Sequence, residues 1–230
     1  MWWSCFTWDI KGPYHIWEKE TVAERKTMEV DLKARNAERY ESDKAKWELE
    51  YAMQRIHIIR NQPGPCATFK HNEDTGAYIV KEGRGGINWY RYQEKVLKPL
   101  LLPFAKRCLE LRPSTIIQED KAPSHNNRYA QKVFDAWEIQ RLLWPGNSPD
   151  LNVIEPTWFW MKRETTKKGP ITSEAKLRKE WIKCWNEMLQ EKIQAWIERI
   201  YYYVQEIIDQ EGDNLYKEGR NKGQSRQRIH

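Results

Sequence analysis

The chain has 230 residues, 40% of them hydrophobic, and its 13 tryptophans can fill a folded core with few side chains. A net charge of +6 and a pI near 9.0 favour a polyanionic partner such as nucleic acid, although the same charge can serve surface solubility alone. No apolar run approaches the ~20 residues of a membrane span, and the opening residues lack a basic leader region, so we expect neither a membrane protein nor a secreted one.

The first elements along the chain are predicted from aromatic and charged patterns. Residues 2–8 and 14–17 are rich in aromatic side chains around a Gly-Pro turn, which predicts a β-hairpin. Residues 21–60 are dominated by Glu, Lys, Arg and Ala with a sparse apolar stripe, which predicts a long helix or helical pair that projects from the core. Residues 61–88 form a turn-rich insertion, with a short hairpin predicted at residues 78–80.

The next stretch alternates between helical and strand-like patterns. Residues 89–111 have helical spacing, and Pro99 and Pro103 are expected to kink or split that helix. Short strands are predicted at residues 115–118 and 139–144. The remaining predicted elements are helices: one capped by Ser124 and ending at Trp137, then 152–168, 173–188 and 190–210, before a basic, disordered tail at 212–230.

This order of elements predicts an α/β fold in which helices flank a mixed sheet. The four cysteines have neither C-x-x-C nor zinc-finger spacing, so we expect packed, reduced thiols in an intracellular protein: Cys5, Cys66, Cys108 and Cys184.

Two carboxylates follow the predicted strands closely enough to share one edge of the sheet. Asp120 ends the strand at 115–118, and Glu155 lies in the first turn of the helix after the next strand. Two convergent carboxylates suit Mg²⁺, which prefers oxygen ligands. Each residue also has a structural alternative, since Asp120 can form a strand-end turn and Glu155 can form a capping box with Asn152.

Charged residues near these two positions also have more than one interpretation. His125 is either a ligand or a solvated residue at the start of a helix. Four basic residues lie one turn or more beyond Glu155 and form either a solvated helix face or a phosphate-binding surface: Lys162, Arg163, Lys167 and Lys168.

Two segments resemble the catalytic motifs of mariner-type transposases of the DDE superfamily. Residues 119–125, Glu-Asp-Lys-Ala-Pro-Ser-His, resemble the D-N-A-P-x-H segment around the second catalytic aspartate. Residues 144–158 resemble the W-P-x-x-S-P-D-L-N-P-I-E-x-x-W segment around the catalytic glutamate. The 34 residues between Asp120 and Glu155 match the spacing of a major branch of that family, and Trp3-Ser4-Cys5-Phe6 resembles its W-G-C-F strand.

The resemblance covers residues 1–168, and the charged helix and Gly-rich insertion resemble fungal-type members. It implies an RNase H-like catalytic domain with insertions at 21–60 and 61–88, followed by a helical extension at 169–211. It also implies three metal-binding carboxylates with Mg²⁺ or Mn²⁺, DNA (transposon ends and target) as partner, a homodimer, and a nuclear location. Asp120 and Glu155 would be catalytic and metal-binding residues.

The sequence departs from the family pattern at three places. Lys121 replaces a frequent Asn, and Val153 replaces a frequent Pro. The family's first aspartate would precede the W-G-C-F strand, and Asp9 in the hairpin turn is a poor substitute for it. We therefore expect an amino-terminally truncated, inactive copy. The alternatives are a non-catalytic nucleic-acid-binding remnant and an interaction protein built on the charged helices.

Overall fold

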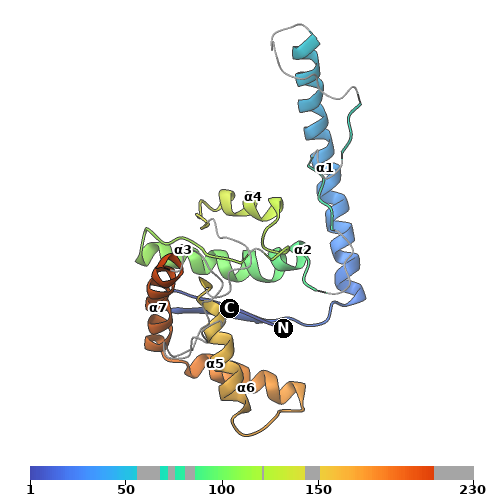
Figure 1. Cartoon of the computed structure of the whole chain (residues 1–230). Helices are drawn as coiled ribbons and strands as arrows, with labels where there is room; N and C mark the ends of the chain where they lie inside the picture. Colours follow the sequence, from blue (N-terminus) through green and yellow to red (C-terminus); the bar gives the residue numbers. More distant parts are fainter. Residues whose placement is uncertain (56–67, 72–75, 81–85, 121, 143–150, 210–230) are drawn as a thin grey trace, which may run out of the picture. The chain divides into compact units, whose positions relative to one another are not determined.

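The computed structural model of the protein describes residues 1–55, 68–71, 76–80, 86–120, 122–142 and 151–209. Within them the chain is a mixed α/β protein, mostly helical, with one two-stranded sheet (Figure 1). It divides into two compact units made of segments distant in sequence. Unit 1 contains residues 1–16, 100–121 and 139–230, and unit 2 contains residues 17–99 and 122–138.

The hairpin predicted at the start of unit 1 is confirmed, but its turn lies at residues 7–10 and the Gly12-Pro13 pair expected in the turn belongs to the second strand. Strand β1 (Trp2–Phe6) pairs antiparallel with strand β2 (Lys11–Ile16), and the register shifts between Ser4 and Phe6. β2 is the only described strand that pairs with β1, so the other edge of β1 has no strand partner within the described residues.

Gly12 in β2 is needed because two side chains approach the strand closely. A Cβ atom at this position would lie 2.5 Å from Sγ of Cys5 and 2.9 Å from a ring carbon of Phe104. Both distances are shorter than non-bonded carbon contacts allow, so a larger residue would push the hairpin away from the helix that carries Phe104.

The core of unit 1 joins the hairpin to the three carboxyl-terminal helices, which are α5 (Ile154–Thr166), α6 (Glu174–Glu187) and α7 (Gln190–Asp209). Its buried residues are Met161, Cys184, Trp185, Met188 and Ile193. Trp2 of the hairpin stacks on Tyr14 at 4.6 Å and lies 5.7 Å from Trp181 between ring centroids. The high tryptophan content therefore serves this core, as each ring buries a large apolar area.

Lys11 attaches the hairpin to the carboxyl end of α6. Its Nζ donates hydrogen bonds to the carbonyl oxygens of Trp185, Asn186 and Met188 at 2.9, 2.8 and 2.6 Å. A helix leaves its last carbonyls unpaired and its carboxyl end partly negative, so a cation is stabilising there. Desolvation by burial lowers the pKa of the Lys11 ammonium.

The long helix predicted at 21–60 is confirmed as α1 (Val22–Arg55), and residues 56–60 lie outside the described part of the chain. Thr21 and Glu24 form a capping box, in which the Thr21 N–H donates to Glu24 at 3.0 Å and the Glu24 N–H donates to Thr21 Oγ1 at 3.1 Å. Figure 1 shows α1 as one uninterrupted helix.

One face of α1 packs within unit 2, and the charged residues on its other face are exposed. Met28 and Leu32 are buried in a cluster with Trp89 and Tyr129. The helix therefore does not simply project from a core, because its first half contributes to the core of its own unit. Its apolar stripe packs on one side of the helix only, as expected from the small number of apolar residues in it.

Residues 76–80 run alongside α1 but do not form the predicted hairpin. The side chain of Asn36 pairs with the backbone of Tyr78, donating to its carbonyl at 2.9 Å and accepting from its N–H at 2.6 Å. The Tyr129 hydroxyl donates to the carbonyl of Ala77 at 2.5 Å. Side chains on two helices hydrogen-bond to backbone groups of this extended segment, so these groups need no partner strand.

The helical region at 89–111 continues through both prolines as three adjoining segments, so the expected split takes the form of a change in helix type. It consists of α2 (Trp89–Tyr92), the π-helix η1 (Gln93–Leu101) and α3 (Leu102–Leu111). Pro99 has no N–H to donate and lies in η1, whose wider turn accommodates the interruption. Pro103 lies in the first turn of α3, where a missing N–H costs nothing.

Among the described residues, the strands predicted at 115–118 and 139–144 amount to a single parallel bridge between Ile117 and Arg141, and residues 143–144 lie outside the described part of the chain. The Ile117 N–H donates to the Gln140 carbonyl at 3.0 Å, and the Leu142 N–H donates to the Ile117 carbonyl at 2.7 Å. The β-branched pattern predicted extended segments at these places. It could not predict the length of the pairing, which depends on neighbouring strands.

The helix between these two segments begins later than predicted. It is α4 (Arg128–Ala136), and its N-cap is Asn127, whose side chain accepts from the N–H groups of Tyr129 and Ala130 at 3.0 and 2.9 Å. The expected cap, Ser124, instead accepts a hydrogen bond from Asn127 through its carbonyl. Ser and Asn are both good N-caps, so the choice between them was decided by packing. None of the described helices is long and apolar enough to cross a membrane.

Candidate functional site

Asp120 lies three residues beyond the parallel bridge and is exposed. Its neighbour Glu119 turns the other way and pairs with Arg141 at 3.0 Å, with only 7% of its side chain exposed. Successive side chains of an extended segment point to opposite faces. Glu119 is therefore used in the structure of unit 1, and Asp120 is presented at the surface.

Glu155 lies in the first turn of α5, as predicted, and α5 begins at Ile154 rather than at Asn152. The N-cap is Val153, and no side chain caps the helix. The capping-box alternative for Glu155 is therefore wrong. A partly buried carboxylate at the start of a helix is stabilised by the helix dipole, and here it has no described structural partner.

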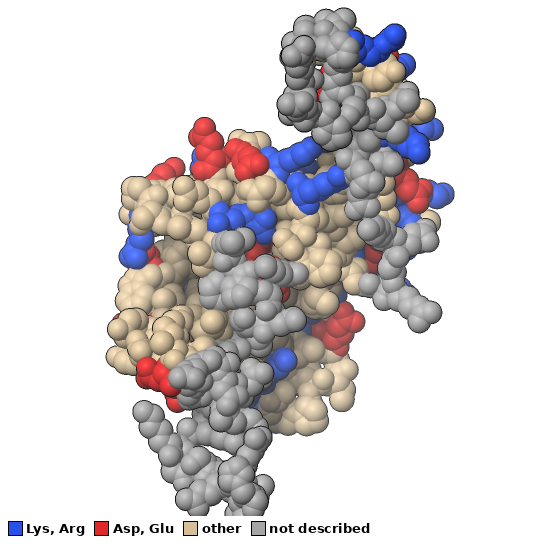
Figure 2. Space-filling view, turned by 45° about the horizontal axis from the view of Figure 1, so that its top comes forward, with Lys and Arg blue, Asp and Glu red and all other residues tan. Residues whose placement is uncertain are grey.

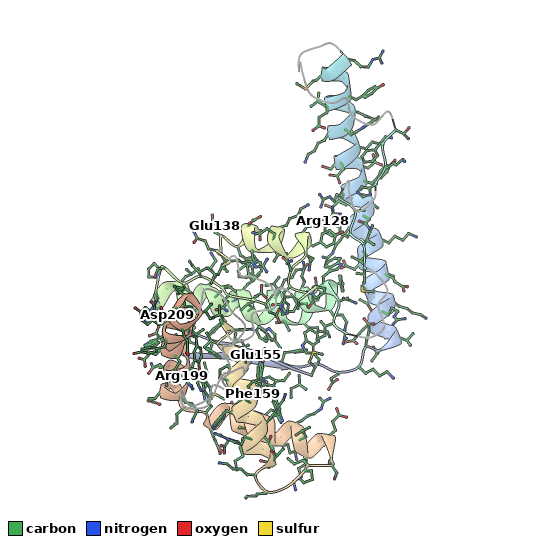
Figure 3. All side chains as sticks on the ribbon, viewed as in Figure 1. Arg128, Glu138, Glu155, Phe159, Arg199 and Asp209 are labelled. Atoms are coloured by element: carbon green, nitrogen blue, oxygen red, sulfur yellow. The ribbon has the colours of Figure 1, made fainter. Side chains whose placement is uncertain are left out.

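The segments that carry the two carboxylates belong to the same unit and contact each other. Nε2 of Gln118 donates to the carbonyl of Leu151 at 3.5 Å, which joins the approach to Asp120 with the approach to α5. Thr157 and Met161 on α5 are fully buried, so the rotation of α5 about its axis is set by the core of unit 1. Figure 3 shows Glu155 in the first turn of this helix.

The electrostatics of Glu155 link it to both Asp120 and Lys162. Burial raises the pKa of the Glu155 carboxyl, and the negative charge of Asp120 raises it further, while the Lys162 ammonium lowers it. Like charges that perturb each other in this way share one region of a protein. Two carboxylates whose charges oppose each other are arranged to accept a cation.

We find no group of three or more His, Cys, Asp or Glu residues suited to a metal ion in the part of the chain that is described. The Asp9 carboxylate is engaged by Arg112, at 3.1 Å, in the hairpin turn. The His125 ring lies against Tyr92, with ring centroids 4.3 Å apart, in the turn before α4 and in unit 2. Asp120 and Glu155 are thus the two carboxylates that the structure brings together.

The four predicted phosphate-binding residues are exposed. Lys162, Arg163 and Lys167 belong to α5 or its C-cap, and Lys168 follows. Lys167 pairs with Glu164, whereas Lys162 and Arg163 have no ion pair with another described residue. On the face shown in Figure 2, charges of both signs are separated by uncharged areas, so the net positive charge does not form a single basic field there.

The three described cysteines are unreactive, as predicted. Cys5, Cys108 and Cys184 are free, and burial raises the pKa of each thiol, to about 11 for Cys184. A protonated, buried thiol is neither a nucleophile nor a metal ligand. Cys66 lies outside the described residues.

Glu155→Gln is expected to stabilise the metal-free chain at neutral pH. The folded-state pKa of Glu155 is raised above its unfolded value, so the folded chain binds more protons than the unfolded chain between these two values. The free energy of unfolding therefore decreases as the pH rises from the unfolded-state pKa of Glu155 to its folded-state pKa. Glu155→Gln cannot ionise, so the variant does not lose this stability. Thermal unfolding measured from pH 4 to pH 8 with a chelator should show a gain that grows with pH. Glu164→Gln is the control, and an equal, pH-independent gain in both variants would contradict the prediction.

Comparison with known proteins finds similarity over the region that contains Asp120 and Glu155. Residues 67–178 match the family described as DDE superfamily endonuclease. The chain is 27% identical over 158 residues to the transposable element Tcb1 transposase of Caenorhabditis briggsae, which covers 64% of this chain and 56% of that protein. It is 25% identical over 120 residues to the Tcb2 transposase of the same species, covering 52% of this chain and 42% of that protein. It is also 25% identical over 123 residues to the Tc1 transposase of Caenorhabditis elegans, covering 53% of this chain and 44% of that protein. The chain thus spans about half the length of these curated relatives.

Proposed function

Because residues 67–178 belong to the DDE superfamily of endonucleases, we propose that this protein is a transposase-type domain that acts on DNA strands with a divalent metal ion. Its substrates would be transposon ends and target DNA, handled by a homodimer in the nucleus, and its catalytic domain would have an RNase H-like fold. The relatives that support this proposal are themselves transposases.

The observation that carries the proposal is that unit 1 contains Asp120 and Glu155 on segments in contact: Gln118, two residues before Asp120, donates to the carbonyl of Leu151, four residues before Glu155. The raised pKa of Glu155, caused by burial and by the Asp120 charge, agrees with this. The two residues occupy the positions of the family's second aspartate and its glutamate. Glu155 does not cap α5, and Asp120 lies exposed at the end of its segment, next to Glu119, which pairs with Arg141. A carboxylate whose pKa is raised by burial and by a neighbouring carboxylate, as that of Glu155 is, is a candidate for a functional role.

The donor chemistry of this pair fits Mg²⁺ or Mn²⁺, since both carboxylates supply hard oxygen ligands. A bound divalent ion would lower the pKa of an attacking water or 3′-hydroxyl and stabilise the leaving oxygen of a phosphodiester. The chain's own contribution is to hold the Glu155 carboxylate on a helix whose rotation is set by Met161, and to keep a cation, Lys162, within electrostatic reach of it. Lys162 and Arg163 can then orient a phosphodiester backbone beside the two carboxylates.

The second candidate is a nucleic-acid-binding domain that does not cut DNA. It is favoured by the lack of a third carboxylate beside Asp120 and Glu155 among the described residues, because the family's chemistry depends on three. The two candidates agree on DNA binding and differ on cleavage.

The 230-residue chain by itself is expected to bind DNA weakly and without sequence preference. It is not expected to nick DNA in Mg²⁺ or Mn²⁺, because its described residues bring together two of the three carboxylates on which the family's chemistry depends. Contacts from four cations would reduce the affinity on the order of 100-fold between 50 and 200 mM salt. Fluorescence anisotropy with a labelled duplex measures the binding, and relaxation of a supercoiled plasmid measures nicking. Metal-dependent nicking that is lost in both Asp120→Asn and Glu155→Gln would show that the domain cuts DNA. Salt-insensitive binding, or none, would overturn the proposed function.

A further inference from the structure

Three consecutive aromatic residues on α5 have different environments. Trp158 and Trp160 pack against the core of unit 1. Phe159 between them is 63% exposed. The core therefore does not account for Phe159. The sequence motifs do not account for it either, because the family pattern specifies the tryptophan before it.

Phe159 lies one helical turn beyond Glu155. Residues four apart on a helix are neighbours on its surface, and Figure 3 shows both residues on α5. The exposed face of the helix continues in the same direction through Lys162, Arg163 and Lys167. Along one face, a partly buried carboxylate is thus followed by an aromatic ring and then by cations.

The ring and the nearest cation are in contact. Nζ of Lys162 lies 6.0 Å from the centroid of the Phe159 ring. The same ammonium lowers the pKa of Glu155, so it acts on both neighbours along this face. An exposed aromatic ring next to cations that lack described ion pairs is the combination that binds a nucleic acid strand, with stacking for the base and charge for the phosphates.

We propose that Phe159 is a stacking platform for an unpaired base of the DNA strand whose phosphates lie on Lys162 and Arg163, next to Glu155. This inference rests on the proposed function, and it adds that the strand at the site is locally unpaired. A base within a duplex is already stacked on its neighbours and does not present its face to a protein ring. The face therefore favours single-stranded or frayed DNA over intact duplex.

The test compares binding of a labelled oligothymidylate of about 20 nucleotides with binding of the same strand in a duplex. Phe159→Ala should weaken single-strand binding by about 5- to 150-fold, the factor that corresponds to 1–3 kcal/mol per stacked base. Duplex binding should change by less than about 2-fold, because phosphate contacts dominate it. Phe159→Tyr keeps an aromatic face and should keep wild-type affinity, whereas Phe159→Leu keeps the apolar character only and should behave like Phe159→Ala.

Salt dependence separates the ring from the cations. Phe159→Ala should leave the slope of log affinity against log salt unchanged, and Lys162→Gln should reduce it by about 0.7 for a single strand. Equal single-strand affinity in Phe159→Ala and wild type, or full rescue by Phe159→Leu, overturns the stacking inference. If this happens while Mn²⁺ still stabilises the chain through Glu155, the inference fails and the proposed function stands. If Mn²⁺ has no effect but Phe159→Ala still weakens single-strand binding, the proposed function fails and the stacking site stands.

Discussion

Mn²⁺ is expected to raise the melting temperature of the 230-residue chain, and Glu155→Gln or Asp120→Asn is expected to remove most of that rise. A ligand that binds only the folded state at 100 times its dissociation constant stabilises by about 2.7 kcal/mol. For a chain of this size, that corresponds to roughly 5–10 °C. The substitutions replace a charged oxygen ligand with a neutral amide of the same shape, so they remove the ligand charge with little change in packing.

The control for the metal experiment lies on the same helix. Glu164→Gln removes a carboxylate from the opposite end of α5, where it pairs with Lys167. Its melting temperature should respond to Mn²⁺ as the wild type does. A Mn²⁺ effect of equal size in Glu155→Gln, Asp120→Asn and wild type would show that the metal binds elsewhere and would remove the basis of the proposed site.

Met161→Ala should destabilise unit 1 by about 2–5 kcal/mol, the usual cost of truncating a fully buried methionine. Met161 has no exposed surface and packs among residues of α6 and α7, so little of the cavity can collapse. Thermal or urea unfolding followed by tryptophan fluorescence measures the loss. Met161 also sets the rotation of α5. The variant should therefore show a smaller rise in melting temperature with Mn²⁺, because Glu155 keeps its charge but shifts in position.

Phe159→Ala is the matched comparison, two residues away on the same helix. Its ring is 63% exposed, so the substitution should change the free energy of unfolding by no more than about 0.5 kcal/mol. A large loss in Phe159→Ala would mean that the ring is part of a packed interface. A small loss in Met161→Ala would mean that the core of unit 1 does not hold α5 in place.

The sequence alone determined the parts of this protein that depend on local chemistry. The hairpin follows from aromatic runs around Gly12-Pro13, and the long helix follows from the charged stretch that Thr21 and Glu24 begin. The candidate site pair, Asp120 and Glu155, was identified from two motifs and their spacing. These features are encoded within a few residues of one another, or in short motifs at a fixed spacing, so no tertiary information was needed.

The tertiary structure decided what depends on distant partners. Pairing at Ile117 is limited to one bridge because strand length depends on neighbouring strands. The helix at Pro99 continues as a π-turn where local rules predicted a break. Burial separates Trp158 and Trp160 from Phe159 on one short helix, and only the packing of α5 on α6 and α7 shows which of the three rings faces solvent. Burial is a property of the assembled core, so the sequence could identify the carboxylate pair but not the exposed ring beside it.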